Sequence, residues 1–229
     1  MNSLKSEFKF LDRRYKDTLV LIPGWATDYR IFSTLDLNYN YILPMKLYPF
    51  AFSQQLLEFL NQKSLAGISL FGWSMGAFLA VEFALNNYNK ADGLILVSLR
   101  MSYETKALEE IKHKLLKNKK AFLYKFYLDC FSDDDKEALM WFKKNLLKGY
   151  TEETSLDELI AGLDYLSCAS INPESLASVK NIRIFHGIED RIAPVQEVNS
   201  LKMHLPKTKF VYLANAGHIP FLGEDFKNV

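Results

Sequence analysis

The sequence has few cysteines and almost no net charge. Its 229 residues include two cysteines, Cys130 and Cys168, which lack the C-x-x-C spacing of a redox or metal pair. A disulfide framework is therefore not expected, and both thiols are predicted to be buried. The 28 basic and 27 acidic residues leave a formal net charge of +1, which gives no overall reason to expect a nucleic-acid partner.

Long apolar runs are also lacking. The N-terminal stretch "MNSLKSEFKFLDRRYK" is charged and has no apolar core of a secretory signal peptide. The least polar segment, "GAFLAVEFAL", is too short to span a bilayer and is interrupted by Glu82. These absences predict a cytoplasmic protein with no membrane partner, and we expect it to be a monomer.

Short apolar, β-branched runs alternate with segments of helical period. This alternation is typical of an α/β domain with a mostly parallel sheet and helices on both faces. Helices are expected over residues 53–63, 76–88 and 195–205, and Ser53 is predicted to cap the first. Strands are expected over residues 7–13 (an edge), 18–23, 40–45, 67–72, 93–98, 182–187 and 209–214.

Residues 100–170 have a different pattern. They contain no convincing strand and are rich in Leu, Lys, Phe, Tyr and Glu at helical spacing. We interpret them as a helical cap inserted into an α/β core that comprises residues 1–99 and 171–229.

The pentapeptide Gly72-Trp73-Ser74-Met75-Gly76 fits the pattern G-x-S-x-G. Such a match also occurs by chance, but here an apolar strand leads in and an apolar helix leads out. In a turn of this kind the serine takes a strained backbone conformation, and the small glycines relieve crowding. The serine hydroxyl is then raised above the carboxyl edge of the sheet, near the positive end of the helix. Ser74 is therefore a candidate nucleophile.

A serine hydroxyl needs a base before it can attack. His113 and His204 lie in polar helical segments and are interpreted as surface residues, and His186 as a packed residue at the end of a strand. His218 follows a strand and the small-residue loop "ANAG", from which an imidazole can reach Ser74. His218 is the candidate base.

An acid and an oxyanion site complete the set. The turn "GIEDRIAP" offers Glu189 and Asp190, one of which is expected to orient the imidazole. Either acid gives the chain order serine, acid, histidine that is found in α/β-hydrolases. The N–H of Met75 and the N–H of Trp25 are candidate oxyanion donors, and Gly24 is expected to let the chain turn sharply before Trp25.

Four segments resemble the α/β-hydrolase superfamily: "LVLIPGWATDYRIF", "LFGWSMGAFLAVEFA", "GLILVS" and "FHGIEDRIAPVQEVNSLKMHLPKTKFVYLANAGHIPFL". Within it they are most similar to the pimeloyl-acyl-carrier-protein methyl ester esterases of biotin synthesis. The acid motif of the superfamily, G-x-x-D-x-x-x-P, falls on Gly187, Asp190 and Pro194. The resemblance therefore implies Asp190, and not Glu189, as the acid.

Two departures from the superfamily accompany this resemblance. The oxyanion loop has Pro23-Gly24 where His-Gly is usual, and the sequence ends eleven residues after His218. The final helix of the superfamily is therefore expected to be short or absent.

The resemblance implies hydrolysis of a methyl ester on a pimeloyl chain attached to acyl carrier protein, with release of methanol. Ser74 would attack, His218 and Asp190 would handle the proton, and no metal or organic cofactor would be needed. Two other functions stay open. One is a small-molecule carboxylesterase or thioesterase with a shielding cap, and the other is a hydrolase-fold protein that binds a ligand without turnover.

The predicted cap carries a basic stretch. Six lysines and no acid occur between Lys112 and Lys125. Such a run is either a solvated helix face or a docking surface for an acidic carrier protein, with Lys114, Lys117, Lys119 and Lys120 as its candidate contacts.

Aromatic residues are interleaved with these lysines. Phe122, Phe126 and Trp141 could line an acyl channel together with Trp25. At helical spacing, ordinary core packing is the alternative interpretation.

Overall fold

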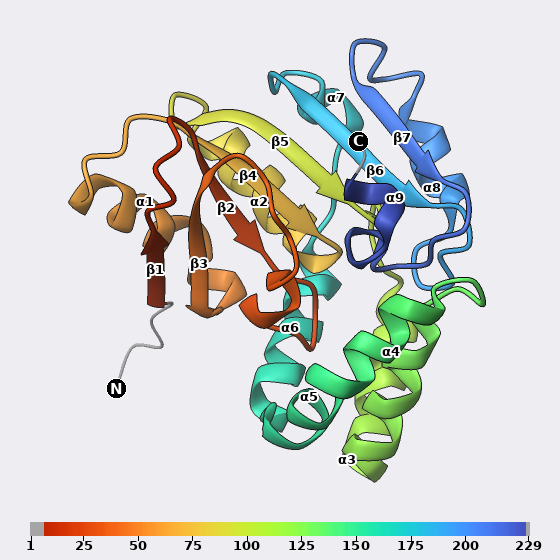
Figure 1. The fold of residues 1–229 in the computed structure, drawn as a ribbon. Coiled ribbons are helices and arrows are strands. Elements are labelled where there is room, and N and C mark those ends of the chain that lie inside the picture. The colour runs from red at the N-terminus through yellow and green to blue at the C-terminus, as the bar shows by residue number, and fades with distance from the viewer. Residues whose placement is uncertain (1–6, 228–229) are drawn as a thin grey trace.

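The computed structural model describes residues 7–227, so residues 1–6 of the charged N-terminal stretch lie outside it. Seven strands form one sheet in the order β1-β3-β2-β4-β5-β6-β7 (Figure 1). Strand β1 pairs antiparallel with β3, and every other pair is parallel, which confirms the predicted fold class. The strands are β1 (Glu7–Leu11), β2 (Thr18–Ile22), β3 (Asn40–Lys46), β4 (Ile68–Trp73), β5 (Ala91–Val97), β6 (Ile182–Gly187) and β7 (Lys209–Leu213).

The central strands are buried on both faces, as their unbroken apolar runs require. All five residues of β2 are buried. Helix α2 (Met75–Asn86) lies behind the sheet in Figure 1, and α9 (Glu224–Lys227) lies in front of it. On the face of α9, Phe226 contacts Phe71 of β4 and Phe185 of β6. Among the described residues, α9 is short.

Two helix boundaries differ from the prediction. Helix α1 (Phe52–Gln62) follows the short helix η2 (Pro49–Ala51), so Ser53 lies inside the first turn and does not cap it. Helix α8 (Val195–Leu201) ends before residue 205. Proline disfavours the helical conformation in the residue before it, and Pro206 follows the predicted end directly.

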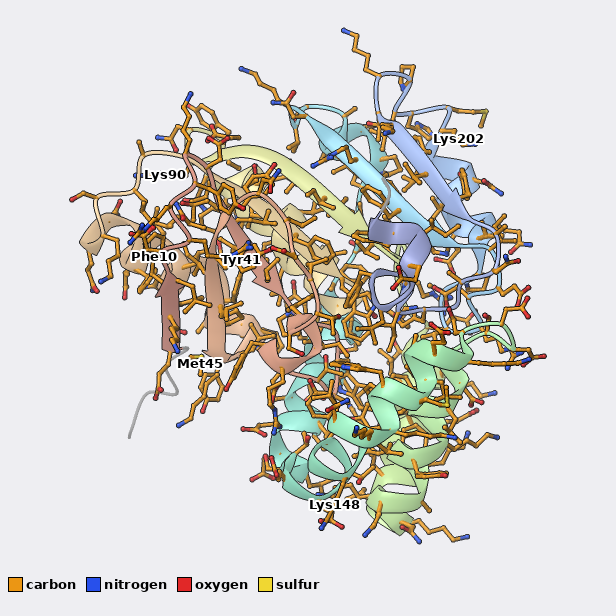
Figure 2. The ribbon with its side chains drawn as sticks, viewed as in Figure 1. Phe10, Tyr41, Met45, Lys90, Lys148 and Lys202 are labelled. Carbon is orange, nitrogen blue, oxygen red and sulfur yellow. The ribbon has the colours of Figure 1, made fainter. Side chains whose placement is uncertain are left out.

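Helices fill the chain between β5 and β6. They are α3 (Thr105–Asp129), α4 (Lys136–Asn145), α5 (Leu147–Glu153), α6 (Leu156–Cys168) and α7 (Pro173–Leu176). Helices α3 to α6, called the cap helices below, lie together beside the carboxyl ends of the strands, and Lys148 is at their outer end (Figures 1 and 2). The division of the chain at residues 100 and 170 stays a prediction.

The cap helices contain one break and one strong cap. Asn118 has the non-helical angles φ −160° and ψ 88°, so α3 consists of two helical halves. Ser155 and Glu158 form a capping box at the start of α6, in which each side chain bonds the other residue's amide. Within residues 7–227, no helix is long and apolar enough to cross a membrane.

The two cysteines differ in exposure. Cys130 is buried, as predicted, but Cys168 is exposed, so that prediction is wrong. Cys168 is the last residue of α6, where the helix leaves the core, whereas Leu163 and Leu166 earlier in that helix are buried.

Candidate active site

Ser74 lies in the turn between β4 and α2 and has the strained angles φ 55° and ψ −118°. The flanking glycines provide room. A Cβ on Gly76 would lie 2.2 Å from the carbonyl oxygen of Ile22, and one on Gly72 would lie 2.4 Å from the carbonyl oxygen of Gly76. Among the described residues no glycine has a positive φ, so the serine itself takes the strain, as predicted for this turn.

Ser74, His218 and Asp190 form a chain of hydrogen bonds. The distance from Ser74 Oγ to His218 Nε2 is 2.9 Å, and that from His218 Nδ1 to Asp190 Oδ2 is 2.8 Å. A carboxylate can only accept, so Nδ1 carries the proton and Nε2 is free to accept from the serine hydroxyl. The three residues are 7%, 1% and 7% exposed, in the order serine, histidine, aspartate. Glu189, the alternative acid, is exposed.

Asp190 is fixed by bonds on both of its oxygens. While Oδ2 faces His218, Oδ1 accepts hydrogen bonds from the amides of Ile192 and Ala193, each at 2.8 Å. Burial alone raises the pKa of Asp190, but the charge and hydrogen bond of His218, with the Ala193 amide, outweigh it and hold that pKa below its ordinary value. The carboxyl group is therefore ionised when the imidazole gains a proton.

His186 is a second buried histidine beside the same acid. It ends β6, as predicted, and its Nε2 lies 2.8 Å from the carbonyl oxygen of Ala193 and 3.7 Å from Asp190 Oδ2. Burial lowers its pKa, despite the opposing charge of Asp190, so the ring is neutral and donates to Ala193. His186 therefore supports the turn that holds Asp190.

The loop after β2 runs alongside the serine. A Cβ on Gly24 would lie 3.0 Å from the Trp73 ring and 3.1 Å from Ser74 Cβ, so a close approach, and not the expected sharp turn, requires glycine there. The positive φ falls instead on Ala26, at 62°. Within the described chain, the amides of Trp25 and Met75 donate no hydrogen bond to other residues. Gly24, Trp25 and Met75 line one cavity of about 260 Å³.

The predicted aromatic contacts divide into two groups. The indole of Trp25 packs edge-on against Phe122 and Phe126 of α3, with ring centroids 6.4 and 5.1 Å away. Its Nε1 donates to the carbonyl oxygen of Leu159 in α6 at 2.9 Å. Trp141 is not brought to this group, because it lines a separate hollow of about 830 Å³ between α4 and the β1–β3 edge.

The four candidate docking lysines fall into two groups according to whether they bond other residues. Lys114 and Lys117 are exposed, and no ion pair joins either to another described residue. Lys120 pairs with Glu152 at 2.9 Å. Lys119 donates to the carbonyl oxygen of Thr154 at 2.7 Å, where α5 ends. Lys119 therefore stabilises a helix end.

Two residues near Ser74 were not predicted to act there. Trp73, inside the G-x-S-x-G motif, donates from Nε1 to the carbonyl oxygen of His218 at 2.7 Å. The phenol of Tyr103 is a second neighbour that interacts with Ser74. Burial, partly offset by Arg100 and Ser74, raises the pKa of Tyr103 to about 12. Trp73 lies within the G-x-S-x-G motif, which was a reason to consider it. No sequence pattern pointed to Tyr103.

Metal ligands do not gather anywhere in the described part of the chain. No group of three or more His, Cys, Asp and Glu side chains there is arranged to hold a metal ion. The chemistry available at Ser74 is a hydroxyl next to an imidazole, with a buried carboxylate behind it and the amide of Met75 directly after it.

Comparison with solved structures defines the fold. A thermophilic esterase from Thermogutta terrifontis superimposes with a TM-score of 0.83 at 17% identity, over 97% of this chain and 89% of that one. MGS-M2, an alpha/beta hydrolase enzyme from a deep-sea metagenome, superimposes with a TM-score of 0.79 at 15% identity, over 97% and 90%. The chain has the α/β-hydrolase fold.

Sequence comparison then gives a particular relative. The chain is 26% identical over 180 residues to the pimeloyl-[acyl-carrier protein] methyl ester esterase of Nitrosomonas europaea, covering 73% of this chain and 71% of that protein. No family model matches the chain. The resemblance predicted from the sequence is therefore confirmed.

Proposed function

We propose that this protein is a serine carboxylic ester hydrolase. The observation that carries the proposal is the buried chain of hydrogen bonds from Ser74 through His218 to Asp190, at 2.9 and 2.8 Å. These distances suit direct proton transfer from the hydroxyl to the imidazole, with the carboxylate stabilising the imidazolium that results.

The proposed reaction has two halves. Ser74 Oγ attacks the ester carbonyl while His218 Nε2 takes its proton, and the amides of Trp25 and Met75 bond the oxyanion. The intermediate collapses when His218 returns the proton to the departing alkoxide, which leaves as the alcohol. His218 then takes a proton from water as the hydroxide attacks the acyl-serine. When this second intermediate collapses, His218 returns the proton to Ser74 Oγ, which leaves as the restored hydroxyl, and the acid is released.

We further propose that the ester is the methyl ester of a pimeloyl chain carried on acyl carrier protein. This substrate is the one named for the relative from Nitrosomonas europaea. The cavity beside Trp25 and Met75 also has apolar walls from Pro44, Leu47 and Leu159, which suit a methylene chain.

The exposed side chains of α3 support a carrier-protein partner. Lys114 and Lys117 are exposed there, and so are the apolar side chains of Leu116 and Tyr124. A mixed basic and apolar face complements an acidic helical carrier, and its attraction weakens as salt rises.

A labelling experiment tests the esterase class. A fluorophosphonate probe is expected to modify the wild-type protein and not Ser74→Ala, because only an activated serine reacts. Tyr103→Phe, which keeps the ring beside Ser74, is the matched variant that should still be labelled. If neither wild type nor Ser74→Ala is labelled, the protein is a ligand-binding member of the fold.

A turnover experiment tests the substrate. Carrier-bound pimeloyl methyl ester is compared with the free methyl ester and with short aryl esters. We expect the highest kcat/KM for the carrier-bound ester. Equal or better turnover of the free esters would instead identify a small-molecule carboxylesterase whose cap shields the site.

The exposed lysines of α3 lead to a prediction about carrier docking. Lys114→Ala together with Lys117→Ala should lower kcat/KM for the carrier-bound ester about fivefold, since exposed charges contribute modestly. The loss should shrink at high salt, and free-ester turnover should not change. Lys119→Ala is the control, because its ammonium already bonds the end of α5. An equal loss for free and carrier-bound esters from the Lys114 and Lys117 changes would contradict docking.

A further inference from the structure

The oxyanion loop is bonded to the end of α3. The hydroxyl of Tyr127, a fully buried residue in the last turns of that helix, donates to the carbonyl oxygen of Ala26. Ala26 directly follows Trp25 and holds a positive φ of 62°, which is costly for a residue with a Cβ. Burial raises the pKa of Tyr127 far above its ordinary value, so the hydroxyl stays a donor. The bond therefore holds a strained backbone next to a proposed oxyanion donor.

The loop that carries Gly217 and His218, called the histidine loop below, is bonded to the turn that follows α3. The amide of His218 donates to the carbonyl oxygen of Cys130 at 2.7 Å. The amides of Gly217 and Ser132 both donate to Asp135 Oδ2 at 2.8 Å. The carboxylate thus joins the histidine loop to the turn after α3.

One short piece of chain, residues 127–135, contacts both of these loops. Tyr127 and Cys130 are one helical turn apart in sequence, so their contacts share a rigid frame. Residues 127–135, all of them within the described chain, make no hydrogen bond with Ser74, whereas the sheet and α2 place the serine itself.

We propose that residues 127–135 position the active site, with Tyr127 fixing the oxyanion loop and Asp135 fixing the histidine loop relative to Ser74. This inference rests on the proposed esterase function and adds two positioning residues to it. Each acts through backbone groups, Tyr127 through the Ala26 carbonyl and Asp135 through the Gly217 amide. Removing either contact should therefore slow the chemical step more than it weakens substrate binding.

Tyr127→Phe tests the oxyanion side, with a short aryl ester as substrate so that no carrier is needed. We expect kcat to fall about tenfold while KM changes less than twofold, because the donor is lost but the ring still packs. Tyr165→Phe is the matched control, since this buried cap tyrosine donates to Glu82 at 2.9 Å, away from both loops. Thermal unfolding should show similar stability losses for the two variants.

Asp135→Ala tests the histidine side in the same assay. We expect a similar loss of kcat and slower fluorophosphonate labelling, since His218 must be in place for Ser74 to react. Glu137→Ala, at the start of α4, is the control, because Glu137 is exposed and no hydrogen bond or ion pair joins its side chain to another described residue.

Two results would decide against the inference. Equal kcat values for Tyr127→Phe and Tyr165→Phe would show that Tyr127 has only a structural role. Equal kcat values for Asp135→Ala and Glu137→Ala would show the same for Asp135. If Tyr127→Phe does not fold, the kcat of Asp135→Ala relative to its control variant decides. A wild-type protein without ester turnover would overturn the proposed function and this inference with it, whereas an active wild type with unaffected variants overturns the inference alone.

Discussion

The serine turn and the two loops around it are held by different parts of the molecule. Ser74 follows β4 directly, its amide donates to Val97 of the neighbouring strand at 2.9 Å, and Gly76 lies against the carbonyl of Ile22. The loops of Ala26 and His218 instead bond residues of the cap helices that are distant in sequence. The core therefore fixes the nucleophile, whereas the cap contributes contacts to the loops of Ala26 and His218, the second of which also bonds Trp73 of β4.

Gly76→Ala is expected to have the largest effect, and it tests the role of the core in holding the serine turn. The new Cβ would lie 2.2 Å from a backbone oxygen of β2, so the sheet or α2 must shift. We expect a loss of about 4 kcal/mol or more in the free energy of unfolding, measured in urea. Gly149→Ala is the control, since its nearest contact would be an ordinary 3.4 Å, and it should stay within about 1 kcal/mol of wild type.

Gly217→Ala makes the corresponding change on the loop side. Its Cβ would lie 2.6 Å from the Cys130 carbonyl oxygen and 2.7 Å from the Ser132 amide. We expect kcat to fall about a hundredfold as the loop moves, while stability falls by only about 2 kcal/mol. Aryl-ester kinetics and urea unfolding measure the two quantities. Unfolding as severe as that of Gly76→Ala would show that the loop belongs to the same core, and the contrast would fail.

The smallest expected effect concerns pH and His186. Its folded pKa lies below the ordinary 6.5, because burial and His218 outweigh Asp190, Glu197 and the Ala193 bond. At low pH, His186 therefore takes up a proton in the unfolded chain more readily than in the folded chain. The free energy of unfolding consequently declines as pH falls below about 6.5. His186→Gln cannot take up this proton, and its melting temperature should vary less between pH 7 and pH 5 than that of wild type. Parallel melting curves for the two proteins would contradict this.

Local patterns predicted the parts of the site that depend on local structure. The strand, G-x-S-x-G and helix around Ser74 are contiguous, so their geometry could be inferred from the residues. The loops of Asp190 and His218 could be placed because parallel strands bring their carboxyl ends to one edge. The roles of all three residues stay predictions until they are tested.

The contacts of the cap helices could not be predicted in this way. Helical spacing shows that Phe122, Phe126 and Trp141 are regularly placed, but it does not say which element each will face. In the folded protein the first two pack against Trp25, and the third lines a different cavity. Likewise, nothing local marks the hydroxyl of Tyr127 as the partner of Ala26, a residue 101 positions away in sequence.

The unequal exposure of the two cysteines makes the cap accessible to spectroscopy. Burial, with the nearby charges of Asp190 and Asp129, raises the pKa of Cys130 well above its ordinary value, so this thiol resists alkylation. Cys168 is exposed at the end of α6. A maleimide dye should therefore attach at Cys168 alone, without any engineered substitution. Its fluorescence would report movement of the helix that bonds Trp25 while the enzyme is turning over.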